Sequence, residues 1–250
     1  MKKKAIIIGA TSGIGREVAR LLAKEGWQIG IAGRREELLQ SLQTEFPDGQ
    51  VKYTALDVTD ADAPTRLQTL VDELGGMDLY FHSSGIGSQN ANLEPEIEIR
   101  TARTNGEGFV RMVTWAFNYL KAHATQDAPG HIAVISSIAG TKGIGIAPAY
   151  SATKRFQNTY VQALVQLAHI QRLPIHFTDI RPGFVATDLL RDAHYPMLMK
   201  AESVARDIVC ALKHRRRIRI IDWRYRLLVF FWRLIPRPIW ERLKITKKQG

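Results

Sequence analysis

The stretch AIIIGATSGIG at residues 5–15 decides the fold of this chain. Its four apolar residues, Ala5–Ile8, predict a buried strand, and a turn with glycines at positions 9, 13 and 15 follows. Val18, Leu21 and Leu22 then show the spacing of an amphipathic helix. Glycines between a strand and a helix let the backbone approach a ligand, and the helix N-terminus favours anions. We therefore expect the pyrophosphate of a dinucleotide at this turn.

Short apolar runs alternate with helical patterns along residues 1–221. The predicted strands are Ala5–Ile8, Ile29–Ala32, Val51–Ala55, Leu79–Phe81, Ile132–Ile135, Ile175–Ile180 and Ile218–Ile221. The longest helical stretches are expected near residues 101–122 and 149–172. Such alternation implies an α/β domain with a parallel sheet covered on both faces. We predict one domain over residues 1–221 and a separate tail over residues 222–250.

The end of the second predicted strand carries two arginines, Arg34 and Arg35. Dinucleotide sites that prefer NAD usually have an acidic residue near this point, whereas an arginine accommodates the 2′-phosphate of NADP. Arg34 therefore predicts NADP(H) in preference to NAD(H), and Arg16, beside the glycine turn, is a second candidate. In the alternative interpretation, Arg34 and Arg35 are solvated residues at the start of a helix.

Tyr150 and Lys154 lie four residues apart, which places both on one face of a helix. A nearby ammonium lowers the pKa of a tyrosine, as a proton donor and acceptor near neutral pH requires. Ser137 follows an apolar strand, so its hydroxyl is expected at the carboxyl end of the sheet, where ligands bind in open α/β folds. These residues predict acid–base chemistry beside the dinucleotide.

In combination, these motifs resemble the short-chain dehydrogenase/reductase family over about residues 4–221. The resemblance implies a doubly wound Rossmann-type domain with about seven parallel strands and helices on both faces. It implies an NADP(H)-dependent oxidoreductase that interconverts a ketone and a secondary alcohol. Tyr150 would be the general acid, Lys154 would hold the nicotinamide ribose and tune Tyr150, and Ser137 would bind the substrate oxygen. Asn105 would hold a water in the proton relay.

The resemblance also implies which residues bind the cofactor. Asp57 and Val58 would border the adenine, and the segment after Arg181 would line the nicotinamide side. The full predicted set is Gly9, Thr11, Ser12, Gly13, Ile14, Gly15, Arg34, Asp57, Val58, Gly85, Tyr150, Lys154, Pro182, Gly183, Val185 and Thr187. One motif departs from the family: the usual Asn-Asn-Ala-Gly after the fourth strand is His82-Ser83-Ser84-Gly85 here. We interpret His82 as structural and expect no metal.

Basic residues are concentrated near the C-terminus. Residues 213–250 hold 13 Lys and Arg against two acidic residues, which accounts for the whole net charge of +11. Arginines alternate there with apolar side chains and with three of the five tryptophans, a pattern typical of a segment in a membrane interface. Arg215–Arg217 would add attraction to anionic lipid. Pro236 and Pro238 are predicted to end one helix and let a second begin near Ile239.

Three interpretations of the tail remain open: an anionic membrane surface, a contact in a homo-oligomer, and a nucleic-acid site. The run Leu227–Trp232 is too apolar for a solvated nucleic-acid groove, so we expect no nucleic acid. The apolar run Ala5–Ile8 is too short for a secretory signal, and no stretch reaches the roughly 20 apolar residues of a membrane span. We expect a cytoplasmic, oligomeric protein that associates peripherally with the inner face of a membrane.

The main hypothesis is a reductase of a hydrophobic or lipid-linked ketone. The alternatives are a soluble carbonyl reductase of broad specificity whose tail serves oligomerisation, and an NADP(H)-binding scaffold or sensor. Residues 140–148 and 188–199 are predicted to be mobile segments bordering the substrate cleft. The single cysteine, Cys210, excludes a disulfide framework, and its apolar surroundings in the sequence predict that it is buried.

Overall fold

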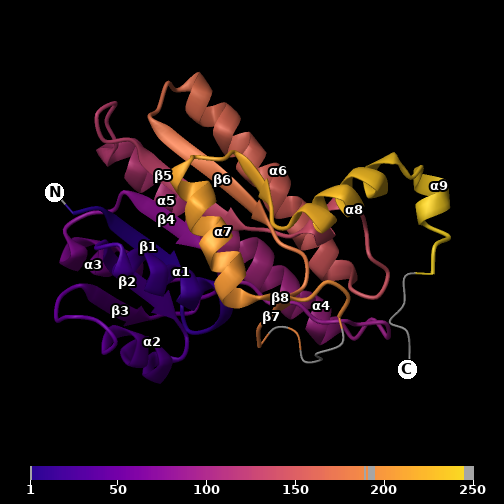
Figure 1. Cartoon of the computed structure of the whole chain (residues 1–250), viewed down its shortest axis with the longest axis horizontal. Coiled ribbons are helices and arrows are strands. Elements are labelled where there is room, and N and C mark those ends of the chain that lie inside the picture. Colours follow the sequence, from indigo (N-terminus) through magenta and orange to yellow (C-terminus); the bar gives the residue numbers. More distant parts are fainter. Residues whose placement is uncertain (1, 189, 191–194, 245–250) are drawn as a thin grey trace.

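The computed structural model describes residues 2–188, 190 and 195–244. Within them, seven parallel strands form one sheet in the order β3-β2-β1-β4-β5-β6-β9 (Figure 1). The strands are β1 (Lys4–Ile8), β2 (Gln28–Gly33), β3 (Val51–Ala55), β4 (Leu79–His82), β5 (Gly130–Ile135), β6 (Ile175–Arg181) and β9 (Ile218–Ile220). A short pair, β7 (Val185–Ala186) and β8 (Met199–Lys200), stands apart. The predicted doubly wound sheet is confirmed.

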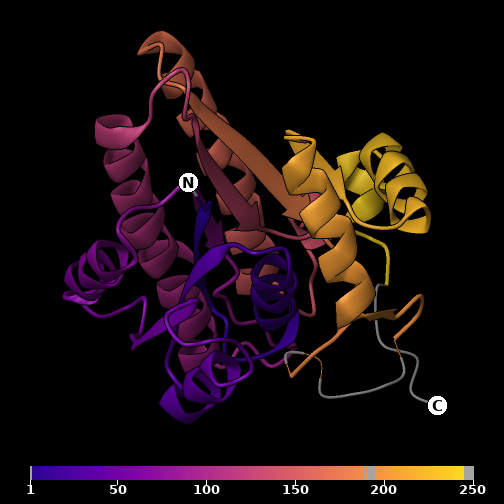
Figure 2. The same ribbon diagram turned by 60° about the vertical axis from the view of Figure 1, so that its left-hand side comes forward.

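Helices cover both faces of this sheet (Figure 2). One layer contains α1 (Gly13–Lys24), α2 (Glu36–Gln43) and α7 (Ala201–Lys213), and the other contains α3 (Ala63–Leu74), α5 (Phe109–His123) and α6 (Pro148–Ile170). In β1, Ala5 and Ile7 pack into the first layer, while Ile6 and Ile8 pack into the second. An apolar run without polar alternation is thus explained by a strand buried on both faces.

The chain reverses its direction of winding at β1, which pairs with β2 on one side and β4 on the other. At such a switch point the loops after the two central strands diverge and leave a crevice at their carboxyl ends. The glycine turn follows β1, and His82–Gly85 includes the end of β4. The fold therefore places both loops at the carboxyl ends of the central strands, where the sequence predicts the dinucleotide.

The long helix expected near residues 101–122 is interrupted. It consists of α4 (Pro95–Ala102), a π-helical turn η1 (Arg103–Gly108) and α5. Such turns are rare, and they occur frequently at functional sites. Here the π-helical turn carries Asn105.

The prediction that Cys210 is buried is wrong, because it lies on the exposed face of α7. The buried face of this helix contains Val204, Ala205, Ile208 and Leu212. At 100° per residue, position 210 points away from Ile208.

The tail forms two helices, α8 (Trp223–Leu234) and α9 (Arg237–Trp240), with the predicted break at Ile235–Pro236. They lie at the end of the molecule opposite to the N-terminus (Figure 1). Lys142, beside the short 3-10 turn η2 (Ile138–Thr141), donates from Nζ to the Ile235 carbonyl at 2.9 Å. Trp240 donates from Nε1 to the Gly143 carbonyl at 2.7 Å. None of the helices within the described residues is long and apolar enough to cross a membrane.

Candidate active site

The glycine turn is closed tightly onto its neighbours. Gly9 and Gly13 have φ values of +87° and +55°, a conformation that disfavours other residues. A Cβ atom at Gly9 would lie 2.6 Å from the Ser84 nitrogen, and one at Gly15 would lie 2.2 Å from the Gly9 oxygen. Helix α1 begins at Gly13 without a side-chain cap, so its first N–H groups remain free for an anion. This turn fits the pyrophosphate of a dinucleotide.

The other predicted residues of the turn, Thr11, Ser12 and Ile14, are partly exposed. Arg35 donates to Thr11 Oγ1 at 3.0 Å and to Ser12 Oγ at 2.8 Å, and its guanidinium lies 3.3 Å from the Asp188 carboxylate. Ile14 packs its side chain against the hydrophobic core below. Arg35, which the sequence interpretation treated as a helix-start residue, is thus the arginine that holds the hydroxyls of the turn.

The three arginines near the turn differ in their freedom to bind a phosphate. The Arg34 side chain is 66% exposed, with Nη1 3.6 Å from Asp57 Oδ2. Arg16 instead donates to the Leu38 carbonyl at 2.6 Å and lies 3.1 Å from Glu45. The structure therefore does not support Arg16 as a ligand of the 2′-phosphate, because α2 already engages its guanidinium.

The predicted adenine side is ordered by local hydrogen bonds. Asp57 Oδ1 accepts from the Thr59 nitrogen at 2.9 Å and from the Thr59 hydroxyl at 2.8 Å. Val58 is buried, and its carbonyl accepts from Arg111 at 3.0 Å. Asp57 and Val58 thus form a fixed edge next to Arg34.

The three predicted catalytic side chains meet at the end of β5. Helix α6 presents Tyr150 and Lys154, with Lys154 Nζ 5.8 Å from the centre of the Tyr150 ring. The Ser137 hydroxyl hydrogen-bonds the Tyr150 side chain. Lys154 donates to the Ile135 carbonyl at 3.1 Å, which fixes the ammonium at the carboxyl end of the strand. A proton donor, a cation and a hydroxyl therefore converge on one point.

Burial dominates the electrostatics of this cluster. It lowers the pKa of Lys154 to about 8, although the Asp179 carboxylate acts in the opposite direction. It raises the pKa of Tyr150, and the hydrogen bond from Ser137 offsets this only in part. The expected lowering of the Tyr150 pKa is therefore not found in this state of the protein, since desolvation outweighs the favourable contacts.

His82 lies at the end of β4 and is completely buried. Its Nδ1 is 2.9 Å from the Tyr80 hydroxyl, and its ring packs edge-on against Phe109. Burial, together with the charge of Lys154, lowers its pKa to about 3. A neutral imidazole packed in this way agrees with a structural role.

Asn105 holds the loop after β4 through its side chain. Its Oδ1 accepts from the Ile86 nitrogen at 2.9 Å, and its Nδ2 donates to the Ile86 carbonyl at 2.7 Å. Gly85 lies between Asn105 and Lys154: a Cβ atom there would be 3.2 Å from Asn105 Oδ1 and 3.5 Å from Lys154 Nζ. Asn105 and Gly85 thus both lie beside Lys154 in the candidate site, while the relay water of Asn105 stays a prediction.

The predicted nicotinamide-side residues follow β6. The Pro182 carbonyl accepts from the Ile138 nitrogen at 3.1 Å, which joins this segment to the Ser137 loop. Val185 is buried in β7, and a Cβ atom at Gly13 would lie 2.9 Å from Thr187 Cγ2. The segment therefore runs from Ser137 to the glycine turn. The lid predicted over residues 188–199 includes residues 189 and 191–194, which lie outside the described residues.

Sequence reasoning missed two polar groups beneath the site. Gln157 is fully buried and contacts Lys154 through Oε1 at 3.0 Å. Asp179 is also buried; it accepts from the Ser136 hydroxyl and pairs with Arg181. Gln157 had a signal: it occupies the same helical stripe as the buried residues Val161, Leu164 and Ala168. A polar residue in an apolar stripe needs a buried partner.

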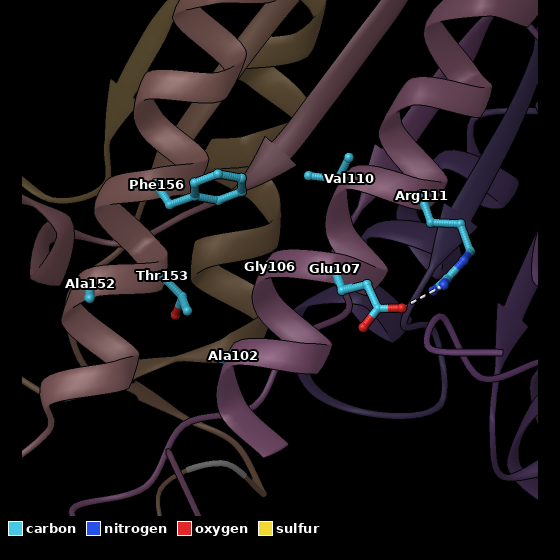
Figure 3. A pocket seen from close by; sticks show the side chains of 8 residues that line it. All are labelled: Ala102, Gly106, Glu107, Val110, Arg111, Ala152, Thr153 and Phe156. Atoms are coloured by element: carbon cyan, nitrogen blue, oxygen red, sulfur yellow. Dashed lines mark hydrogen bonds and ion pairs between the residues drawn. The ribbon is translucent and has the colours of Figure 1, made fainter. Parts of the chain in front are cut away.

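A hollow of about 660 Å³ opens between α6 on one side and the end of α4, η1 and the start of α5 on the other (Figure 3). Its wall is mostly apolar, with Val110 and Phe156 facing across it and the Glu107–Arg111 ion pair at one side. Thr153 connects it to the site, because Thr153 Oγ1 accepts from Asn105 at 3.2 Å. The remaining lining residues are Ala102, Gly106 and Ala152.

Comparisons with known proteins agree with this geometry. The family model described as short chain dehydrogenase matches residues 3–196. An uncharacterised oxidoreductase of Myxococcus xanthus is 34% identical over 200 residues, which cover 78% of this chain and 77% of that protein. An uncharacterised oxidoreductase of Mycobacterium tuberculosis is 29% identical over 248 residues, covering 94% of this chain and 95% of that protein.

Among solved structures, a variant of actinorhodin polyketide ketoreductase with NADPH has a TM-score of 0.74 and 24% identity to this chain. The match covers 88% of this chain and 95% of the ketoreductase chain, and at this identity it supports the fold. The family model carries the assignment further, because it spans most of the chain and its range includes the glycine turn, Ser137, Tyr150 and Lys154. The chain therefore belongs to the short-chain dehydrogenase family of oxidoreductases.

Proposed function

We propose that this protein is an NADP(H)-dependent reductase that converts a hydrophobic or lipid-linked ketone to a secondary alcohol, or catalyses the reverse reaction, at a membrane surface. The observation that carries the reaction type is the convergence of Ser137, Tyr150 and Lys154 at the end of β5. A purely binding protein would not need a proton donor, a buried cation and a hydroxyl in one place.

The nicotinamide cofactor would supply a hydride to the carbonyl carbon. In the direction of reduction, the Tyr150 hydroxyl donates its proton to the carbonyl oxygen, and the Ser137 hydroxyl holds the same oxygen by a hydrogen bond. The ammonium of Lys154 lies beside the Tyr150 ring and stabilises the phenolate after the proton has left. Hydride and proton together complete the alcohol.

The preference for NADP(H) is supported by Arg34, directly after β2, while Arg35 holds the hydroxyls of the turn. Arg34 is largely exposed, and Arg35 lies across the hydroxyls of Thr11 and Ser12. Guanidinium groups bind phosphate through charge-assisted and bidentate hydrogen bonds. A 2′-phosphate bound at this edge of the site would contact the exposed guanidinium of Arg34.

The membrane surface is supported by the outer face of α8. Five large apolar side chains form one stripe, each between 50% and 67% exposed: Trp223, Leu227, Phe230, Phe231 and Leu234. Arg226 and Arg233 are also exposed and flank this stripe. Both acidic residues of the region are paired, Asp222 with Arg224 and Glu241 with Arg237. An apolar stripe with unopposed basic neighbours fits an anionic bilayer.

The three arginines at 215–217 are placed differently from the expectation. Arg215 and Arg217 line a separate hollow together with Arg172 and His176. These two arginines precede the N-terminal end of β9, whereas α8 follows its C-terminal end. The proposed contact with lipid is therefore assigned to α8 and α9.

The decisive experiment compares Tyr150→Phe with Tyr160→Phe. Tyr160 lies on the same helix, and its hydroxyl contacts Thr114 at 2.6 Å. Both variants and the wild type are assayed for NADPH oxidation with long-chain ketones delivered in vesicles. We expect Tyr150→Phe to lose turnover and to bind NADPH normally, while Tyr160→Phe stays active. Full turnover in Tyr150→Phe would contradict the proposed mechanism.

A further inference from the structure

Tyr225 connects the tail to the active site. It lies in the first turn of α8 and is 0% exposed. Its hydroxyl accepts from the Phe184 nitrogen at 3.1 Å and lies 3.1 Å from both the Pro196 and the Met197 carbonyl oxygens, to which it can donate. One phenol group thus bridges the two described ends of the segment that follows β6.

The ring of Tyr225 also covers the backbone of this segment. A Cβ atom at Gly183 would lie 2.2 Å from Tyr225 Cζ and 2.4 Å from both Cε atoms. The ring therefore occupies the space that a side chain at position 183 would need. Gly183 precedes Thr187, whose methyl group lies against Gly13 of the glycine turn.

The strand pairing that also holds this segment is only two residues long. Strands β7 and β8 contain two residues each and pair Val185 with Met199 and Ala186 with Lys200. The Met199 nitrogen donates to the Phe184 carbonyl at 3.0 Å, and the Phe184 ring packs on Tyr195 at 4.6 Å between centroids. With so little sheet, a buried hydroxyl that bonds both ends contributes substantially to fixing the segment.

Helix α8 itself is fixed against the body, so Tyr225 has a rigid support. Asp222 caps the helix by accepting from the Arg224 nitrogen at 2.8 Å. Val229, one turn after Tyr225, is buried in the same core cluster. At the far end, the Ile235 carbonyl is held by Lys142. The helix therefore presents its apolar stripe to the outside and Tyr225 to the site.

We propose that Tyr225 is a positioning residue of the active site. By bridging Phe184 to Pro196–Met197 and covering Gly183, it holds the nicotinamide-side residues against the glycine turn. The role of Gly183 and Thr187 in cofactor binding is part of the proposed function, and the positioning role rests on it. The tail is in this way a component of the cofactor site as well as the proposed lipid-facing element.

The test replaces Tyr225 by Phe, which keeps the ring and removes the hydroxyl. Loss of the bridge should raise the Kd for NADPH and the KM for NADPH about 3- to 10-fold, as expected for one lost buried hydrogen-bonding group. The kcat at saturating substrate should stay within about twofold, because Tyr225 contacts none of Ser137, Tyr150 and Lys154 through a hydrogen bond. Tyr160→Phe is the matched control and should leave both constants unchanged.

Hydrogen exchange supplies a readout that needs neither cofactor nor turnover. The Phe184 amide should exchange faster in Tyr225→Phe than in the wild type and in Tyr160→Phe, with circular dichroism showing the same fold in all three. Equal exchange at Phe184 would overturn the positioning role. If the wild type binds no NADPH and reduces no ketone, the proposed function fails, and the exchange experiment still decides whether Tyr225 holds the segment.

Discussion

Lys154 donates a hydrogen bond to the side-chain oxygen of Gln157, 3.0 Å away in the interior of the protein. The amide nitrogen of the same glutamine donates to the Asn105 carbonyl at 2.9 Å. The proposed catalytic cation is therefore held by a neutral acceptor, which is itself oriented by the π-helical turn. Because this acceptor carries no charge, burial is free to lower the pKa of Lys154 to about 8.

Gln157→Glu should extend activity to higher pH. A carboxylate beside the ammonium favours the charged form of Lys154 and raises its pKa, so the alkaline limb of kcat/KM should move upward by about one pH unit. Gln157→Leu removes the acceptor and should move the limb to lower pH. Rates between pH 6 and 10 measure both shifts. Identical profiles for the two variants and the wild type would show that Gln157 does not tune Lys154.

His82 should make the protein sensitive to acid. Its pKa is about 3 in the folded state, against an ordinary value of 6.5. Between these two pH values, His82 is protonated in the unfolded chain and neutral in the folded protein. Stability from the neutral imidazole is complete above pH 6.5 and decreases as the pH falls toward 3. By linkage, the loss at pH 5 is about 2 kcal/mol.

Urea unfolding at pH 7 and pH 5 tests the role of His82. His82→Asn removes the titrating group, so it should lose less stability between the two pH values than the wild type. His169→Gln, at an exposed position of α6, is the control and should behave as the wild type. If His82→Asn loses as much stability as the wild type, the acid sensitivity has another origin.

Local pattern predicted the strands, the glycine turn and the shared helix face of Tyr150 and Lys154 well, because these features depend on neighbouring residues. Gly9 and Gly13 require positive φ, and Tyr150 and Lys154 share a face through helix geometry alone. Contacts between distant residues could not be predicted in this way. Tyr225 reaches Phe184 across 41 residues, and Gln157 reaches Asn105 across 52. Arg16 appeared free in the sequence because nothing local shows that Leu38 and Glu45 bind it.

Arg34 should determine the choice of cofactor. Replacing it by alanine removes one charge-assisted contact to a 2′-phosphate, so kcat/KM for NADPH should fall about 10- to 100-fold. The value for NADH, which lacks this phosphate, should change little. Arg206→Ala, an exposed arginine of α7 that contacts Ser203, serves as the control. Equal losses with NADPH and NADH would mean that Arg34 does not select the 2′-phosphate.

The double variant Phe230→Glu/Phe231→Glu should abolish binding to anionic vesicles. It places two negative charges within the apolar stripe of α8. The change removes apolar area that the bilayer would bury, and the new carboxylates repel anionic lipid. Ile170→Glu is the matched control, since Ile170 is 72% exposed at the end of α6, far along the chain from the tail. Flotation at low and high salt measures the effect, and wild-type binding should weaken as salt rises.

The mass of the particle in solution distinguishes the two remaining interpretations of the tail. If the stripe contacts lipid, the double variant keeps the oligomeric state and activity of the wild type toward a short soluble ketone while it loses flotation. If the stripe is a subunit contact, the variant dissociates, and the wild type does not float with vesicles. In that case the outer face of α8 would be a surface between copies of the chain, and the substrate search would turn to soluble carbonyls.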